Sequence, residues 1–213
     1  MEAVVIPAIL VKSREELLRR ISQVQGLVPE IQLDIMDGVF VPNKTIGLDE
    51  LRDLPEAKYE FHWMVANPGD WIEKVPGPHM HLVHIETITS LEKIESAVKR
   101  AGGSLGLAIN PETPLEKLLP HVQRSRRVLV MTVHPGFSGQ KYIYEMGDKI
   151  RKLRSLYPDL DIEVDGGVNR ETIAHAYSSG ANILAAASAI FSSDDIKGAI
   201  ADLRRRAAAG APS

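Results

Sequence analysis

Short apolar runs rich in β-branched residues alternate along the chain with longer segments whose apolar residues recur at helical spacing. The short runs predict eight strands, at residues 4–10, 30–34, 59–65, 81–85, 104–109, 127–133, 161–164 and 183–186. The longer segments predict helices at residues 13–24, 48–54, 68–75, 90–101, 114–122, 144–156, 169–179 and 194–206. Eight such alternations are typical of a (β/α)₈ TIM barrel.

The predicted barrel fills one domain, residues 1–206, and leaves a short tail. Residues 207–213 have no periodic apolar face, so we expect them to fray. The helical pattern is weakest at residues 48–54 and 68–75, and the loss of both helices would favour an open sheet instead of a closed barrel.

Composition narrows the range of partners. The 213 residues carry a formal net charge of -3, and Lys and Arg are scattered, so we expect no nucleic acid partner. The absence of cysteine excludes disulfides and thiolate catalysis, so any metal must bind nitrogen or oxygen donors. The chain has neither a secretory leader pattern nor an apolar run long enough to span a bilayer, and we expect a cytoplasmic protein with no membrane partner.

Two predicted strands lead into a carboxylate and then a glycine turn. Asp34 ends the second strand, and Asp165 follows the seventh and precedes Gly166 and Gly167. Because the carboxyl ends of barrel strands meet at one mouth, we expect the carboxylates to address opposite faces of a bound substrate. One carboxylate could then remove a proton next to a carbonyl while the other acid returns one. The alternative is that each aspartate only caps the turn after its strand.

Three segments closely resemble the signature segments of ribulose-phosphate 3-epimerases. They are DIMDGVFVPN at residues 34–43, MTVHPGFSGQ at 131–140 and EVDGGVN at 163–169. The resemblance extends from PAIL at residues 7–10 to SAIF at 188–191. It implies an epimerase that interconverts D-ribulose 5-phosphate and D-xylulose 5-phosphate through an enediolate stabilised by a metal ion. In that reaction Asp34 and Asp165 would be the acid/base residues.

The resemblance also implies one divalent metal ion, which could be Zn, Fe, Mn, Co or Mg. Asp34, Asp165 and His62 match three of its ligands, and Gln32 stands where the family has a second histidine. An amide oxygen is a weaker donor than imidazole for zinc, iron or cobalt, so we expect this substitution to lower the metal affinity or to shift the preference toward magnesium or manganese. Both the identity of the metal and the need for it therefore stay open. His84 matches a recurrent family segment, where it could support the site or only pack.

Three segments, one after each of the last three predicted strands, could donate backbone amides to a phosphate group, and the first two of them are rich in glycine. Together with the resemblance they predict a substrate and phosphate site that contains His62, Ser138, Gly139, Gln140, Gly166, Gly167, Ala187 and Ser188. Further residues are expected to line the substrate cavity, namely Met36, Met64, Met131 and His134. The chain departs from the family pattern at Ala8, His134, Ser138 and Ala187, where the family usually has Ser, Asn, Gly and Gly.

Other functions stay open at this stage. The chain could epimerise another ketose phosphate, such as a hexulose 6-phosphate, or it could be a phosphosugar-binding homologue with a weakened metal site. A lyase of the related barrel group would carry Lys in an Asp-x-Lys-x-x-Asp motif, where this chain has Met36. In each case the expected partner is a small phosphosugar. Because relatives in the family are oligomeric, the resemblance also implies a homo-oligomer.

Overall fold

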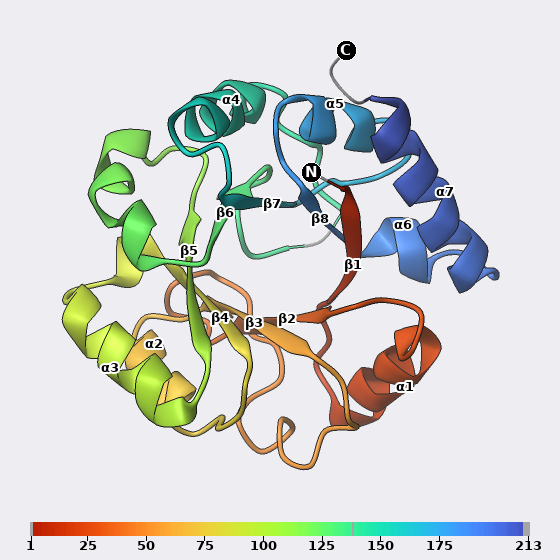
Figure 1. Cartoon of the computed structure of the whole chain (residues 1–213). Helices are drawn as coiled ribbons and strands as arrows, with labels where there is room; N and C mark the ends of the chain where they lie inside the picture. The colour runs from red at the N-terminus through yellow and green to blue at the C-terminus, as the bar shows by residue number, and fades with distance from the viewer. Residues whose placement is uncertain (1, 138, 211–213) are drawn as a thin grey trace.

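A closed barrel of parallel strands forms the centre of the protein. The structure, a computed structural model, describes residues 2–137 and 139–210. The barrel runs in chain order from β1 to β8 and is closed by pairing of β1 with β8 (Figure 1). Its strands are β1 Val4–Ile9, β2 Ile31–Met36, β3 Tyr59–Met64, β4 Met80–His84, β5 Ser104–Ile109, β6 Arg127–Met131, β7 Asp161–Asp165 and β8 Ile183–Ala186. The predicted (β/α)₈ architecture is therefore confirmed.

Helices surround the barrel, and the sequence shows why two of them begin where they do. The α-helices are α1 Arg14–Val24, α2 Pro68–Ile72, α3 Leu91–Ala101, α4 Met146–Leu156, α5 Ile173–Ser178, α6 Ser188–Phe191 and α7 Ile196–Ala209, and the 3₁₀ turns are η1 Ile85–Thr87, η2 Leu115–Lys117 and η3 Leu119–Arg124. The hydroxyl group of Ser13 accepts a hydrogen bond from the backbone N–H of Glu16 and caps α1, and that of Ser90 accepts one from Lys93 and caps α3. Gly102 follows the last residue of α3 and caps the helix with a φ of 82°, which glycine readily adopts.

Two predicted helices did not form as α-helices. Residues 48–54 make successive turns, and Asp53 takes a positive φ of 49° that a helix does not contain. Residues 114–122 form the 3₁₀ turns η2 and η3, since Pro120 lacks an N–H group and cannot continue an α-helical ladder. Because the 68–75 segment does contain α2, the condition for an open sheet is not met.

The last helix is longer than expected. Helix α7 continues to Ala209, and Ala207 is fully buried. Burial against the rest of the protein explains why residues 207–209 are helical where we predicted a frayed tail. Residues 211–213 of that tail lie outside the described residues.

The strands bury both faces and divide apolar from polar positions. Leu33, Ile35 and Trp63 belong to the large apolar cluster that also contains the buried faces of the helices. The polar Asp34 lies between Leu33 and Ile35, and the polar His62 directly precedes Trp63. The register of β2 with β3 pairs Asp34 with His62. Since successive side chains of a strand point to opposite faces, this alternation assigns the polar residues to the barrel interior.

A buried ionic cluster lies near the amino ends of the strands. Arg127 Nη1 lies 2.8 Å from Glu30 Oε2 and 3.3 Å from Glu163 Oε2, and it also contacts Glu60. Burial raises the pKa of Glu60 to about 7 and raises the pKa of Glu163 well above its usual range. The guanidinium thus faces more carboxyl groups than it can neutralise.

No helix in the described residues combines the length and the apolar character that crossing a bilayer requires.

Candidate active site

Three potential metal ligands meet at the carboxyl ends of strands that are far apart in sequence. Asp34 lies on β2, His62 on β3 and Asp165 at the end of β7. One donor atom from each of them lies within 4.8 Å of the others. His62 Nδ1 is 3.0 Å from Asp34 Oδ1 and 3.4 Å from Asp165 Oδ2. Two carboxylate oxygens and one imidazole nitrogen are a suitable donor set for a divalent cation.

Gln32 lies at the centre of this donor set. Its Nε2 donates to Asp34 Oδ1 at 2.8 Å and to Asp165 Oδ2 at 2.9 Å, and it lies 3.3 Å from His62 Nδ1. Its Oε1 is buried and has no hydrogen-bond partner among the described residues. The predicted doubtful ligand thus contacts every other member of the predicted set.

A buried chain of side chains orients His62. His62 Nε2 lies 2.8 Å from His84 Nε2, and His84 Nδ1 lies 3.3 Å from Glu86 Oε2. The other carboxylate oxygen, Glu86 Oε1, accepts the backbone N–H of Asn110 at 2.9 Å. Burial by itself would raise the pKa of Glu86, but hydrogen bonds from His84, Thr113 and Asn110 lower it to about 2.

The charge of Glu86 decides which ring nitrogens carry hydrogen. A carboxylate only accepts, so His84 Nδ1 carries hydrogen, and burial lowers the pKa of His84 and keeps its ring neutral. His84 Nε2 is then an acceptor, and His62 Nε2 must donate to it. The remaining ring nitrogen, His62 Nδ1, is directed at the two aspartates. His84 therefore supports the site, which settles the choice between support and packing.

Burial and the neighbouring charges shift the pKa values of Asp34 and His62. Burial raises the pKa of Asp34, and the negative charge of Asp165 adds to this effect. Burial opposes protonation of His62, but the hydrogen bonds that its protonated ring donates to the carboxylates of Asp165 and Asp34 outweigh burial and raise the pKa of His62 to about 9. Positive charge is therefore favoured between the two carboxylates, whether it comes from a proton or a cation.

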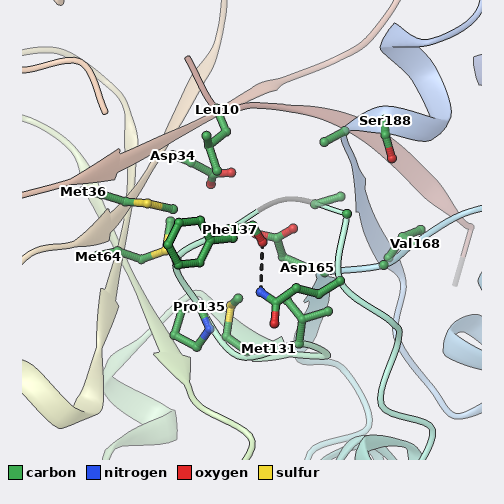
Figure 2. Close-up of a pocket in the computed structure, with 18 of the residues that line it drawn as sticks. Leu10, Asp34, Met36, Met64, Met131, Pro135, Phe137, Asp165, Val168 and Ser188 are labelled. Carbon is green, nitrogen blue, oxygen red and sulfur yellow. Dashed lines mark hydrogen bonds between the residues drawn. The ribbon is translucent and has the colours of Figure 1, made fainter. Parts of the chain in front are cut away.

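The two aspartates line a cavity at the barrel mouth (Figure 2). Its volume of about 180 Å³ is small compared with sites for drug-sized ligands. Met36, Met64 and Met131 form part of its wall. Their apolar, polarisable side chains can exclude water from a reacting carbon.

The predicted phosphate turns line the same cavity. The described members that do so are Gly139, Gln140, Gly166, Gly167, Ala187 and Ser188, whereas Ser138 lies outside the described residues. A Cβ atom on Gly166 would lie 2.4 Å from Val133 Cγ2, and one on Gly167 would lie 2.9 Å from Tyr142 N. Both positions also have positive φ. The turn after β7 therefore needs glycine for two independent reasons.

Some predicted residues lie outside the cavity wall. His134 does not line the cavity, and its side chain is 64% exposed and contacts Glu112. Gln32 and His62 are buried behind the wall, where they contact Asp34.

Phe137 and Asn169 line the cavity although the sequence reasoning did not single them out. Both occur inside the signature segments quoted above. Their position in those segments was the available signal.

Comparison with known proteins gives a consistent result. Residues 4–191 match the family described as the ribulose-phosphate 3 epimerase family. The chain is 42% identical over 184 residues to a protein of Oryza sativa subsp. japonica named ribulose-phosphate 3-epimerase, cytoplasmic isoform. The alignment covers 82% of this chain and 81% of the rice protein. It is 41% identical over 182 residues to the ribulose-phosphate 3-epimerase of Methanocaldococcus jannaschii, in an alignment that covers 82% of this chain and 78% of that protein.

Solved structures share the fold at low sequence identity. 3-Hexulose-6-phosphate synthase from Salmonella typhimurium superposes with a TM-score of 0.72 at 14% identity, covering 97% of this chain and 99% of the other. KGPDC from Streptococcus mutans gives a TM-score of 0.75 at 12% identity, covering 98% of this chain and 99% of the other. At these identities the likeness concerns the barrel alone.

Proposed function

Because the chain belongs to the ribulose-phosphate 3-epimerase family, we propose that it interconverts D-ribulose 5-phosphate and D-xylulose 5-phosphate. The observation that carries the proposal is the placement of Asp34 and Asp165 in one small cavity, on β2 and β7. Two acid/base groups on different elements are what inversion at one carbon requires. The protein is accordingly an isomerase that acts on a carbohydrate phosphate.

The proposed reaction moves one proton off C3 and another onto it. One aspartate removes the C3 proton, and the electron pair of the C–H bond shifts to form an enediolate with negative charge on the C2 oxygen. The other aspartate, in its acid form, then delivers a proton to the opposite face of C3, and the carbonyl at C2 forms again. Burial raises the pKa of Asp34, which favours its acid form more than in an exposed aspartate. The methionine wall keeps water from protonating the enediolate.

The described residues fit a divalent cation at this site. Asp34, His62 and Asp165 would hold it, and Gln32 Oε1, which has no partner within residues 2–137 and 139–210, is a further oxygen that can turn toward it. A bound cation supplies positive charge beside the developing oxyanion. The hydrogen bond between His62 Nε2 and His84 keeps His62 Nδ1 directed at the site, as support around metal-binding histidines commonly does.

We propose that the turns after β7 and β8 hold the phosphate end of the substrate. We infer that Gly166 and Gly167 after β7, together with Ala187 and Ser188 after β8, receive the phosphate group. This location matches the usual phosphate site of such barrels, after strands seven and eight. Gln140 and Gly139 would close over it from the loop after β6. We further propose a homo-oligomeric cytoplasmic enzyme.

The proposal is tested by following the C3 proton of ribulose 5-phosphate in D₂O by NMR. We expect deuterium exchange together with formation of xylulose 5-phosphate. Asp34→Asn should reduce turnover by about 10²-fold or more because it removes one acid/base group. Absence of exchange with folded protein, either metal-free or supplied with Mn²⁺, Zn²⁺, Fe²⁺ or Mg²⁺, would contradict this substrate. Ligand binding without exchange would then favour a phosphosugar-binding protein, and exchange with a hexulose 6-phosphate would favour a longer ketose.

A further inference from the structure

The amide of Gln32 lies between the two aspartates, and its orientation is fixed by chemistry. Asp34 Oδ1 and Asp165 Oδ2 lie within 2.9 Å of Gln32 Nε2. An amide nitrogen donates hydrogen bonds and does not accept them, so Gln32 Nε2 donates one hydrogen to each of these carboxyl oxygens and the NH₂ end of the amide faces them. The carbonyl end is thereby turned toward buried surroundings, where Oε1 has no partner among the described residues.

We propose that the Gln32 NH₂ group is a built-in substitute for the cation, which joins Asp34 to Asp165 and competes with a metal ion for the same carboxylates. Each of its two hydrogens is used by one aspartate. The inference deepens the proposed function, since it concerns the same acid/base pair. It assigns Gln32 a positioning role, holding the aspartates together in protein that has no cation.

The competition follows from the two ends of one amide. A cation held by Asp34, His62 and Asp165 would be repelled by the NH₂ hydrogens that now point at the carboxylates. Rotation of the amide by half a turn would direct Oε1 at the cation, and it would break both hydrogen bonds to the aspartates. Hydrogen bonds to charged acceptors in a buried site are stronger than average ones, so their loss opposes cation binding.

Two consequences separate Gln32 from the histidine of the family pattern. The metal-free site is held together by Gln32, whose nitrogen offers a separate hydrogen to each carboxylate, whereas an imidazole nitrogen carries at most one hydrogen. A cation must displace the amide, whereas a histidine offers a stronger ligand for transition metals. The protein should therefore bind Mn²⁺ weakly and keep its stability without it.

The test compares metal-stripped wild-type protein with Gln32→His and Gln32→Leu. We expect Gln32→His to bind Mn²⁺ at least about tenfold more tightly, as measured by the free Mn²⁺ signal in electron paramagnetic resonance. We expect metal-free Gln32→Leu to unfold at a lower temperature than wild type, because the buried Asp34 and the partly buried Asp165 lose their donor. Gln23→His on α1 is the matched control for any histidine added outside the site, and it should leave Mn²⁺ affinity unchanged.

A measurement on the wild-type protein covers the case in which the variants fail to fold. The side-chain NH₂ signals of Gln32 in a ¹⁵N-labelled sample should shift on titration with Zn²⁺, because the amide leaves the carboxylates. Unshifted signals while Zn²⁺ binds would overturn the inference. So would equal Mn²⁺ affinities, within about twofold, of wild type and Gln32→His. These readouts are independent of turnover. The inference about Gln32 can therefore fail while ribulose 5-phosphate is still epimerised, and it can hold while ribulose 5-phosphate is not epimerised.

Discussion

His81 on β4 is a buried histidine that the structure holds in its neutral form. Its Nδ1 accepts the indole N–H of Trp63 at 3.1 Å, which requires a free lone pair on that nitrogen. The ring also stacks against Phe61 and Trp63. Burial lowers the pKa of His81 to about 4, with a smaller contribution from neighbouring His79. The neutral imidazole is therefore part of the apolar packing beneath the helices.

This lowered pKa makes stability depend on acidity in a defined window. An unfolded histidine takes up a proton near pH 6.5, whereas folded His81 resists protonation until about pH 4. The free energy of unfolding should therefore fall as pH decreases from 6.5 to 4, by up to about 3 kcal/mol from this residue. His81→Gln should show a smaller decrease than wild type in urea unfolding at a series of pH values. Parallel pH dependences of the two proteins would contradict the assignment.

At the scale of residues, the sequence predicted the strand-end groups better than their neighbours. Asp34 and Asp165 each follow an apolar run, so the carboxyl-end rule of barrels placed them in the cavity. His134 lies in a loop whose path the pattern of apolar residues does not determine, and it points toward Glu112 instead. The contact between His62 and His84 depends on side-chain directions across two strands, which sequence spacing does not give.

At the scale of elements, the loop after β6 depends on a contact with the loop after β2. Asn43 Nδ2 donates to the backbone carbonyl of Gly136 at 2.8 Å, and Asn43 Oδ1 accepts the N–H of Lys44 at 2.9 Å. Gln140 adds bonds to the carbonyls of His134 and Phe137 within the loop. Phe137 lines the cavity although its side chain is largely exposed. The buried Asn43 thus fixes a segment that would otherwise have little packing.

Asn43→Asp should loosen this segment while keeping the acceptor for Lys44. Losing the bond to Gly136 corresponds to about 1 kcal/mol, so we expect a reduction in kcat/KM of about fivefold, mainly through a higher KM. Steady-state rates of xylulose 5-phosphate formation measure this. Asn43→Ala, which also removes the acceptor for Lys44, should lose at least as much. Unchanged kinetics of the Asp variant would show that the contact with Gly136 does not hold the loop for catalysis.

The accuracy of the element predictions follows from the kind of structure each segment forms. The strands were predicted within a few residues because barrel strands are buried on both faces and read as apolar runs. The segments at 48–54 and 114–122 have leucines at helical spacing, but Pro55 follows one and Pro120 lies within the other. Periodicity alone did not distinguish an α-helix from successive turns there.

At the scale of the whole molecule, the two ends of the barrel carry different charged groups. The carboxyl ends hold Asp34 and Asp165, and the amino ends hold Arg127 with its three glutamates. The barrel interior between them is filled by apolar side chains such as Leu82 and Leu129. A change at the amino ends should therefore affect stability more than chemistry.

Arg127→Met removes the only cation found in that cluster among the described residues. It leaves buried carboxyl groups without a positive partner, and breaking such a pair typically destabilises a protein by about 3–5 kcal/mol. Urea unfolding measures the loss, and the rate per folded molecule should stay near that of wild type. Glu163→Gln is the informative companion, because removing one excess carboxyl should cost little or stabilise. A loss below about 1 kcal/mol for Arg127→Met would contradict this account.

The molecule also illustrates how chemistry separates from fold. A synthase from Salmonella typhimurium shares the barrel at 14% identity, and this chain has Met36 in place of the lysine of an Asp-x-Lys-x-x-Asp motif. Met36 instead forms part of an apolar cavity wall beside Asp34. The residues at the strand ends, and not the barrel scaffold, therefore distinguish an epimerase from a lyase.

The pairing of β1 with β8 has a consequence for how the protein is made. Val4 pairs with Ile183, so the first strand acquires its second neighbour only after most of the chain has left the ribosome. Until then the nascent sheet exposes hydrogen-bonding edges at both of its ends, which can pair with another chain. The interval of greatest risk of aggregation thus falls during translation, and slower synthesis of the last strand would prolong it.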